Sequence, residues 1–281
     1  MSPKDGLEGR GNSGRDEGEV GSTDVVQIEV SSGILTATLA DVENRNALGA
    51  ELLDGLRGAI RRANADDSIR AVVVTNLGST FCAGANLKQQ SNQKASGKPG
   101  VGGGGFPELL HEIQTSKTPI IGRIDGHVVG GGNGLASALD ISIAREDVKF
   151  GFTEVRLGVV PAIISVVCLP KMRRGEAMEA FLRGHRFSGT RAAELGLINR
   201  AVPGEQLDAA VEEVLADLRK GGPEALGLAK SLVYEVPRRE TADAIEWTTA
   251  LSSRLFAGEE AKEGMKAFLE KRPASWASKE N

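Results

Sequence analysis

Three short, uninterrupted runs of aliphatic residues constrain the fold of this chain more than any other feature of its sequence. They cover residues 71–75 (AVVVT), 120–124 (IIGRI) and 140–144 (DISIA). Runs of this length without polar alternation are typical of strands that are buried on both faces of a parallel sheet. Parallel neighbours need long crossover connections, and helical patterns lie between these runs. The sequence therefore predicts an α/β fold.

Two further β-rich runs come before the first of these strands. Residues 25–30 (VVQIEV) and 34–39 (ILTATL) are joined by a Ser-Ser-Gly turn, which is the layout of a hairpin. A helix is predicted from Glu51, because apolar residues then recur at helical spacing up to the polar cluster at 64–68. Together these elements predict a core domain over residues 24–202.

The two ends of the chain differ from this core domain. Residues 1–23 contain almost no large apolar side chains, so we expect a disordered tail there. Residues 203–281 predict a separate C-terminal helical region, with helices at 206–218, 223–233, 241–256 and 259–269. Inside the core domain, residues 96–105 (SGKPGVGGGG) are too rich in glycine for a regular element and predict a surface loop.

Charge and composition exclude several classes of partner. The formal net charge is only −4 and aromatic residues make up 4% of the chain, so the sequence offers neither a basic stripe nor stacking rings for nucleic acid. Cys82 and Cys168 lie in apolar stretches and predict no disulfide framework or zinc site, which fits a cytoplasmic protein. Because there is no signal peptide pattern and no apolar run of about 18 residues, we expect no membrane association. A small molecule is the expected partner.

Two glycine-bearing segments could hold a negatively charged oxygen with backbone amides. Residues 80–87 (TFCAGANL) place small side chains around Gly84, which lets backbone N–H groups approach a ligand closely. A simple tight turn is the alternative. Residues 129–135 (VGGGNGL) lead into a predicted helical stretch at 135–139, where unpaired amides feel the positive end of the helix dipole. A phosphate loop is disfavoured there, because the Lys-Ser/Thr pair that contacts phosphates and Mg²⁺ is missing.

A third segment, residues 149–161 (KFGFTEVRLGVVP), carries a carboxylate among apolar neighbours. Burial in such surroundings raises the pKa of a carboxyl group, so Glu154 is suited to proton transfer near neutral pH. The alternative is that Glu154 forms an ordinary surface ion pair with Arg156 or a nearby lysine.

Taken together, the three segments resemble the enoyl-CoA hydratase/isomerase superfamily, also called the crotonase family. The resemblance is carried by FCAGANLK (81–88), IDGHVVGGGNGLASALDISIA (124–144), FGFTEVRLGVVP (150–161) and EGMKAFLEKRPASW (263–276). It extends from about residue 25 to residue 276 and implies a spiral of ββα units followed by a C-terminal helical trimerisation region. The implied partners are an acyl-CoA thioester substrate and further copies of the chain, in a homotrimer or a dimer of trimers.

The resemblance also implies roles for single residues. By motif position, the backbone amides of Ala85 and Gly131 would polarise the thioester carbonyl, and Glu154 would transfer the proton. The other positions implied to contact the substrate or its coenzyme A portion are Ala83, Gly84, Asn86, Leu87, Lys88, Gly130, Gly132, Gly134 and Lys271. Coenzyme A enters as part of the substrate, so neither a separate cofactor nor a metal is implied.

Two departures from the family pattern bear on the reaction. Well-known hydratases of the family carry a glutamate where this chain has Gly134, so Glu154 would act alone or with another group. A single glutamate is what the Δ3,Δ2-enoyl-CoA isomerases of the family use, whereas the sequence around Glu154 resembles branches assigned as hydratases. We favour hydration, with isomerisation or acyl-CoA binding without catalysis as alternatives. Asn86 replaces a common aspartate and still supports turn hydrogen bonds.

Several other polar residues are weaker candidates. Glu108, His111 and Glu112 lie on a predicted helix beside the implied acyl pocket and could assist Glu154, although solvated surface positions are the alternative. His127 and His185 have no serine and acid pattern around them and are expected to be structural or surface residues. Basic residues that could contact the phosphates of coenzyme A are Lys88, Lys271 and Arg272, the last two from a neighbouring subunit.

Overall fold

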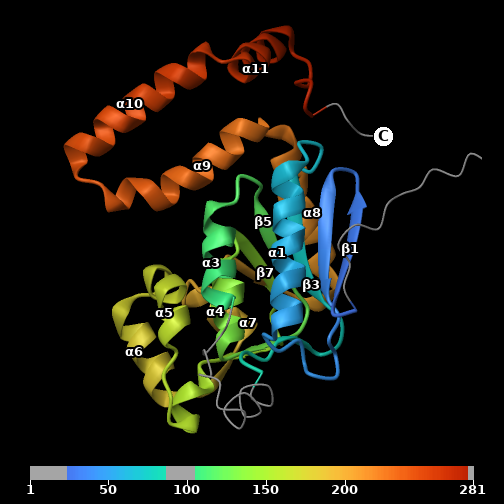
Figure 1. Cartoon of the computed structure of the whole chain (residues 1–281), viewed down its shortest axis with the longest axis vertical. Coiled ribbons are helices and arrows are strands. Elements are labelled where there is room, and N and C mark those ends of the chain that lie inside the picture. Colours follow the sequence, from blue (N-terminus) through green and yellow to red (C-terminus); the bar gives the residue numbers. More distant parts are fainter. Residues whose placement is uncertain (1–23, 87–104, 278–281) are drawn as a thin grey trace, which may run out of the picture.

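The computed structural model describes residues 24–86 and 105–277, and its larger β-sheet has six strands in the order β1-β2-β3-β5-β7-β10 (Figure 1). These strands are β1 (Val26–Ser31), β2 (Ile34–Leu39), β3 (Ala71–Asn76), β5 (Ile120–Ile124), β7 (Ile141–Arg145) and β10 (Arg200–Val202). The first two pair antiparallel, and the strands from β2 to β10 are parallel. The three aliphatic runs form β3, β5 and β7, so the predicted α/β fold is confirmed.

A second, smaller sheet has the strand order β4-β6-β8-β9. Its strands are β4 (Thr80–Cys82), β6 (His127–Val129), β8 (Lys149–Gly151) and β9 (Arg186–Ser188). The first three are parallel, and each follows a strand of the larger sheet along the chain. This repetition of two strands and a helix matches the expected spiral of ββα units. The sequence did not predict these strands, because three residues are too few to show a periodic pattern.

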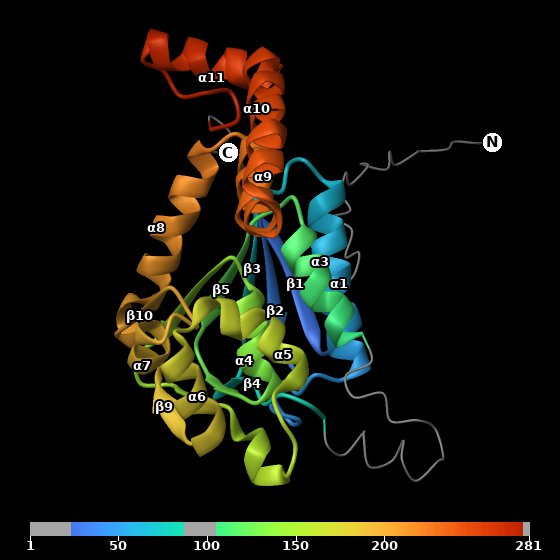
Figure 2. The same cartoon turned by 90° about the vertical axis from the view of Figure 1, so that its left-hand side faces the viewer.

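Helices cover both faces of the larger sheet (Figure 2). On one face, α1 (Ala50–Ala65), α3 (Phe106–Thr115) and α4 (Gly131–Ala138) share the main hydrophobic core with alternate strand residues such as Val72 and Val74. On the other face, α8 (Leu207–Lys220) packs against residues such as Val73. This alternation is the two-residue period of a strand buried on both sides.

Shorter helices complete the core around the smaller sheet. They are η1 (Thr153–Leu157), α5 (Ala162–Cys168), η2 (Leu169–Lys171), α6 (Arg174–Arg183), α7 (Gly189–Glu194) and η3 (Gly204–Gln206). Helix α5 packs along α4, which places the segment after β8 against the segment after β6.

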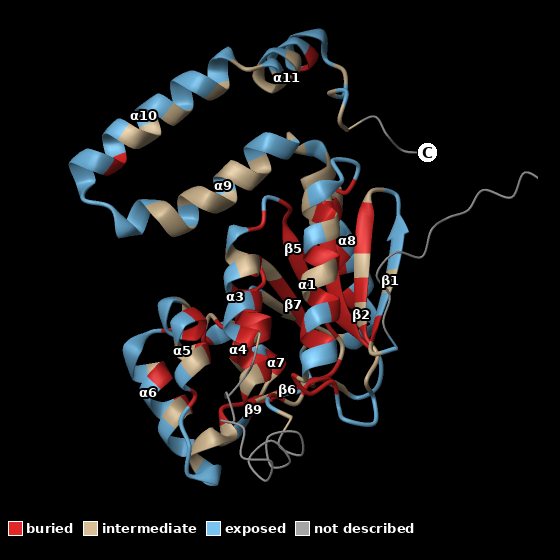
Figure 3. Cartoon of the chain, in the orientation of Figure 1, coloured by how far each residue is buried: buried red, intermediate tan, exposed pale blue. Residues whose placement is uncertain are grey.

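The last helices lie at the opposite end of the molecule from α5 and α6 (Figures 1 and 2). They are α9 (Pro223–Glu235), η4 (Val236–Arg238), α10 (Thr241–Ala257) and α11 (Glu259–Glu270). An ion pair of 2.8 Å between Lys230 Nζ and Asp140 Oδ2 ties α9 to the core. Helices α10 and α11 are largely exposed and bury only Ala244 and Ala267 (Figure 3).

The predicted domain division remains a prediction, and α8, the first long helix after residue 202, packs on the core sheet. The predicted tail (1–23), most of the predicted glycine-rich loop (96–105) and the candidates Leu87 and Lys88 lie outside the described residues. Among the helices that the structure describes, none has the length and apolar character needed to cross a membrane.

Candidate active site

Three loops converge at the carboxyl ends of β4, β6 and β8, which are adjacent parallel strands. The chain leaves β4 into residues 83–86, leaves β6 into the first turn of α4, and leaves β8 into η1. Residues that follow neighbouring parallel strands meet at one edge of a sheet, where α/β proteins commonly bind ligands. The three motifs are separated along the chain but adjacent in space.

The first two loops touch backbone against backbone. Gly84 has a φ of +84°, and a Cβ built there would lie 2.7 Å from the Gly131 nitrogen and 2.9 Å from the Val129 oxygen. A side chain would therefore separate the loops, and the left-handed conformation also favours glycine. A 2.7 Å hydrogen bond from Leu48 N–H to Gly84 O supports the first loop from the segment before α1.

This contact brings together two backbone amides with no partner. Within the described residues, no hydrogen bond is donated by the N–H of Ala85 or the N–H of Gly131. Gly131 is the first residue of α4, so its amide has no carbonyl to bond within the helix and lies at the positive end of the helix dipole. Both residues line the same cavity, where two unpaired donors can stabilise a developing oxyanion.

Glu154 lines this cavity from η1. Its carboxyl group lies against the second loop, since a Cβ built at Gly130 would be 3.6 Å from Glu154 Oε1. The Oε2 atom is buried, and no described residue bonds to it or forms an ion pair with Glu154, including the exposed Arg156. Burial raises the pKa of Glu154 above its usual value, although a hydrogen bond from its own backbone amide partly opposes this. A carboxyl group with these properties can accept and return a proton near neutral pH.

The cavity has a volume of about 310 Å³ and mostly apolar walls. Besides the three loops, its walls include Leu48, Phe106, Leu157, Val159, Val160, Pro161, Ala162, Ile163 and Ile164. A larger cavity of about 750 Å³ lies between the ends of α1 and α3 and helix α9, and its walls include none of the three motifs. We place the site in the smaller cavity, because its carboxyl group and amides are unpaired, whereas Lys117 in the larger one is paired with Asp67.

Helix α5 fills the space beside Gly134, the position at which the resemblance implies that a second glutamate is missing. Gly134 is buried in α4, and a Cβ built there would lie only 2.1 Å from Ile164 Cγ2 of α5. Any side chain at residue 134 would overlap Ile164, which itself lines the cavity. The described part of the cavity therefore contains one carboxyl group, that of Glu154.

The remaining motif positions surround this centre. Ala83 and Gly130 line the cavity, while Gly132 is buried behind it, where its Cα lies close to the Cys82 backbone. Asn86 is half-buried. Lys271 is exposed at the end of α11 and is not among the residues that line the cavity.

The proposed helper residues on α3 do not reach the cavity. Glu112 forms ion pairs of 2.8 Å with Arg57 and 2.9 Å with Arg61, and Glu108 and His111 are exposed. From α3, only Phe106 lines the cavity. The His127 ring accepts a 3.0 Å hydrogen bond from the Lys149 amide at the edge of the smaller sheet.

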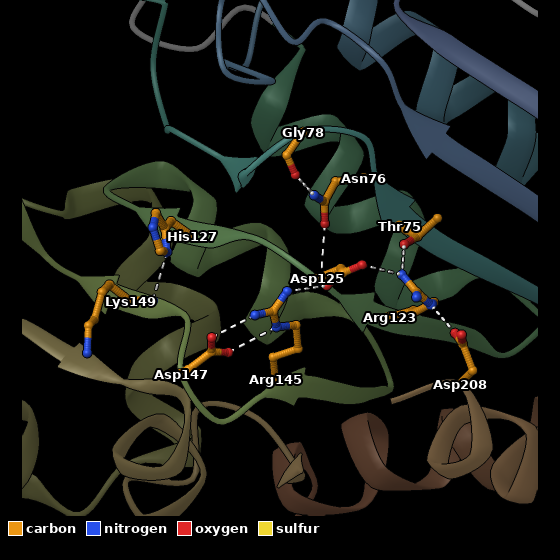
Figure 4. Close-up of polar contacts among 10 residues, drawn as sticks. All are labelled: Thr75, Asn76, Gly78, Arg123, Asp125, His127, Arg145, Asp147, Lys149 and Asp208. Carbon is orange, nitrogen blue, oxygen red and sulfur yellow. Dashed lines mark hydrogen bonds and ion pairs between the residues drawn. The ribbon is translucent and has the colours of Figure 1, made fainter. Parts of the chain in front are cut away.

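The carboxyl ends of the larger sheet are organised differently (Figure 4). Arg123 bonds to Asp208 at 2.6 Å and to Asp125 at 3.2 Å, and Arg145 bonds to Asp125 at 3.2 Å and to Asp147 at 2.6 Å. These ion pairs occupy the charged groups at the ends of β5 and β7. Among the residues that the structure describes, no group of three or more potential metal ligands is gathered at either edge.

Comparison with known proteins gives one consistent result. A family model described as enoyl-CoA hydratase/isomerase matches residues 29–279. A crotonyl-CoA hydratase from Syntrophomonas wolfei is 30% identical over 236 residues, covering 83% of this chain and 90% of that protein. The crystal structure of an enoyl-CoA hydratase from Mycobacterium avium is 37% identical with a TM-score of 0.68, covering 91% of this chain and all (100%) of that one. AtuE from Pseudomonas aeruginosa is 29% identical with a TM-score of 0.84, covering 90% of this chain and 100% of that one.

Proposed function

Because this chain belongs to the enoyl-CoA hydratase/isomerase family, we propose that it adds water across the C2=C3 bond of an enoyl-CoA thioester. The observation that carries the proposal is the meeting of two unpaired amides, Ala85 and Gly131, with the carboxyl group of Glu154, whose Oε2 atom is unpaired, in one cavity. The substrate would supply its own coenzyme A, so the proposal includes no separate cofactor.

In the proposed mechanism, the thioester oxygen accepts hydrogen bonds from the Ala85 and Gly131 amides. As water adds to C3, the Glu154 carboxylate accepts a proton from it, and the C2=C3 electrons move to form an enolate on that oxygen. Each amide would stabilise the enolate by about 3 kcal/mol. Glu154 then returns the proton to C2 and the carbonyl re-forms, so the net change is H at C2 and OH at C3.

One observation favours a second candidate, the 3-enoyl-CoA to 2-enoyl-CoA isomerase. The contact between Gly134 and Ile164 leaves no room for a second carboxyl group that would help to hold water. A lone Glu154 could remove a proton from C2 or C4 and return it to the other carbon, with the same enolate between the two steps.

Two ultraviolet assays separate these reactions. Hydration removes the conjugated thioester absorbance of crotonyl-CoA or a branched analogue, whereas isomerisation produces that absorbance from a 3-enoyl-CoA. We expect the wild-type chain to remove the absorbance of a 2-enoyl-CoA in the first assay faster than it produces that absorbance from a 3-enoyl-CoA in the second. Faster generation would favour the isomerase, and tight acyl-CoA binding without turnover across chain lengths would contradict both enzymes.

The proposed substrate has an apolar acyl group, because aliphatic side chains such as Leu157, Val159 and Val160 line the cavity. A panel of enoyl-CoA thioesters of different length and branching tests this. A charged or strongly polar acyl group should be a poor substrate, because transfer into these walls would remove its hydration.

We also propose the trimer, or dimer of trimers, that the family resemblance implies. Helices α10 and α11 expose large apolar side chains, including Phe256 at 67% and Phe268 at 82% exposed, which a neighbouring subunit would cover. Sedimentation of the wild-type chain and of Phe268→Glu tests this. A wild-type chain that sediments as a monomer would contradict it.

A further inference from the structure

We propose that Asn133 is a positioning residue that aims the Gly131 amide at the substrate carbonyl and fixes its distance from Glu154. The inference deepens the proposed function and rests on it. It comes from a closed set of hydrogen bonds beneath the cavity, in which one buried amide side chain joins the β6 loop to the β8 loop.

Asn133 is the third residue of α4 and is only 1% exposed. Its Nδ2 group donates to Gly130 O at 3.0 Å and to Gly151 O at 2.9 Å. Its backbone N–H donates to the same Gly130 O at 2.9 Å, and Gly130 N–H donates to Gly151 O at 3.0 Å. Each of the two carbonyl oxygens thus accepts two hydrogen bonds, and Asn133 contributes to both.

The orientation of the Asn133 amide follows from its neighbours. Both partners of the side chain are carbonyl oxygens, so only the NH₂ group can face them. This leaves Oδ1 buried, and no described residue bonds to it. An unpaired buried acceptor is unfavourable, so a requirement for stability alone does not explain an asparagine at this position. What the asparagine supplies is a pair of donors to two different loops.

Holding Gly130 O determines where the Gly131 amide points. The carbonyl of Gly130 and the N–H of Gly131 belong to one planar trans peptide unit and point in opposite directions. Two hydrogen bonds hold that oxygen on the side of Asn133, so the N–H is directed to the other side, where Gly131 lines the cavity. Donation to the oxygen also polarises the peptide, which makes the opposite N–H a stronger donor.

The bond to Gly151 O extends this control to the acid. Gly151 ends β8, three residues before Glu154. Glu154 Oε1 would be 3.6 Å from a Cβ at Gly130, so the carboxyl group and the donor loop are already in close proximity. By joining Gly130 to Gly151, Asn133 sets the separation between the oxyanion donor and the proton-transfer group. Such separations must be held to within about 1 Å for efficient catalysis.

Two variants and one control test the proposal. Asn133→Ala removes both side-chain bonds, and Asn133→Ser keeps a hydroxyl that can bond to Gly130 O, three residues earlier, but cannot span to Gly151. Ser137→Ala is the matched control, because Ser137 is buried on the same helix and donates to the Leu197 carbonyl instead. The readouts are kcat and KM for the best enoyl-CoA, and the absorption band of bound 4-dimethylaminocinnamoyl-CoA. That band moves to longer wavelength when the thioester carbonyl is polarised.

We expect kcat of Asn133→Ala to fall about 10-fold to 100-fold with little change in KM, since an oxyanion donor is misaimed but the cavity is kept. The band shift should shrink in parallel, Asn133→Ser should recover part of both, and Ser137→Ala should match wild type. A stable Asn133→Ala or Asn133→Ser variant with wild-type kcat and band shift would overturn the inference. The inference would also be overturned if Asn133→Ala lost affinity for an S-alkyl-CoA thioether by the same factor as its kcat falls, because that ligand lacks the carbonyl. If wild type itself neither turns over an enoyl-CoA nor shifts the band, the proposed function fails and the inference fails with it.

Discussion

The carboxyl ends of the parallel strands in the two sheets use polar groups in opposite ways. At the ends of β5 and β7, Arg123, Arg145 and three aspartates neutralise one another in ion pairs (Figure 4). At the ends of β4, β6 and β8, two amides and the Oε2 atom of Glu154 remain unpaired at an apolar cavity. Buried polar groups are almost always paired in native proteins, so the buried and unpaired Oε2 atom of Glu154, beside two free amides, indicates function. The larger sheet uses its charges for stability, and the smaller sheet keeps its polar groups available for a substrate.

Exchanging one carboxylate for an amide at the carboxyl ends of each sheet tests this contrast most strongly. Glu154→Gln should lower kcat by about 10²-fold to 10⁴-fold, because the amide cannot transfer the proton. Asp147→Asn removes a carboxylate that is bound to Arg145 and should leave kcat unchanged. Steady-state rates of both variants check this. Equal rates in Glu154→Gln and wild type would remove Glu154 from the mechanism.

Adding a single methyl group at Gly84 should lower kcat nearly as much as Glu154→Gln does. Gly84→Ala forces a Cβ against the Gly131 nitrogen at a left-handed residue, so we expect kcat to fall by about 10²-fold to 10³-fold. The matched control is Gly58→Ala in α1, where a Cβ meets nothing within 4 Å. That variant should keep its activity and gain slightly in stability, because alanine favours helix. Full activity in Gly84→Ala would show that the approach of the two loops is not required.

The pH dependence of activity should report the unpaired carboxyl group. Glu154 must be ionised to accept a proton from water, and burial raises its pKa. The acid limb of kcat/KM should therefore lie above the usual glutamate pKa of about 4.3, with about a tenfold change per pH unit below the midpoint. A limb at or below that pKa would contradict the burial of Glu154 in the active protein.

Stability should respond to the same group with a definite sign. Because its folded-state pKa is raised, Glu154 favours folding only while protonated, and this contribution is lost as pH rises from the unfolded pKa through the folded one. Glu154→Gln should therefore be more stable than wild type at pH 8, and this advantage should shrink towards pH 4. Urea unfolding at several pH values measures it. An advantage that does not vary with pH would exclude titration of Glu154 as its cause.

The smallest effect is expected at the larger sheet. Arg123→Ala breaks bonds to Asp208, Asp125 and Thr75, yet Arg123 and both aspartates are partly solvated, so the free energy of unfolding should fall by only about 1 kcal/mol. Activity should stay within about twofold of wild type, as for most substitutions away from a functional site. A large loss of kcat without unfolding would mean that the carboxyl ends of both sheets contribute to catalysis.

The sequence predicted the larger sheet and the long helices better than the smaller sheet and the start of α4. The strands β3, β5 and β7 and the four C-terminal helices follow from apolar runs and helical periodicity, because burial on both faces or on one face leaves a direct pattern. The three-residue strands β4, β6 and β8 leave no such pattern, since their neighbours determine their pairing. Helix α4 begins at Gly131, earlier than the pattern from Leu135 predicted, because packing overrides the low helix propensity of glycine.

The same limit applies within the candidate site. The apolar neighbours of Glu154 predicted a buried carboxyl group, and the structure shows that its pKa is raised by burial. Two features could not be predicted because they depend on residues far apart in the sequence. Ile164 fills the space beside Gly134 across 30 positions, and Asn133 bonds to Gly151 across 18. The position of Asn133, three residues after Gly130 at a helix start, was the only local signal for its role.

A crystal structure with a bound enoyl-CoA or 3-hydroxyacyl-CoA would test the central claim most directly. The account predicts the thioester oxygen at about 3 Å from both the Ala85 and the Gly131 nitrogens, with the Glu154 carboxyl group facing C2 and C3. A thioester bound outside this cavity, or a carbonyl oxygen that contacts neither amide, would contradict it.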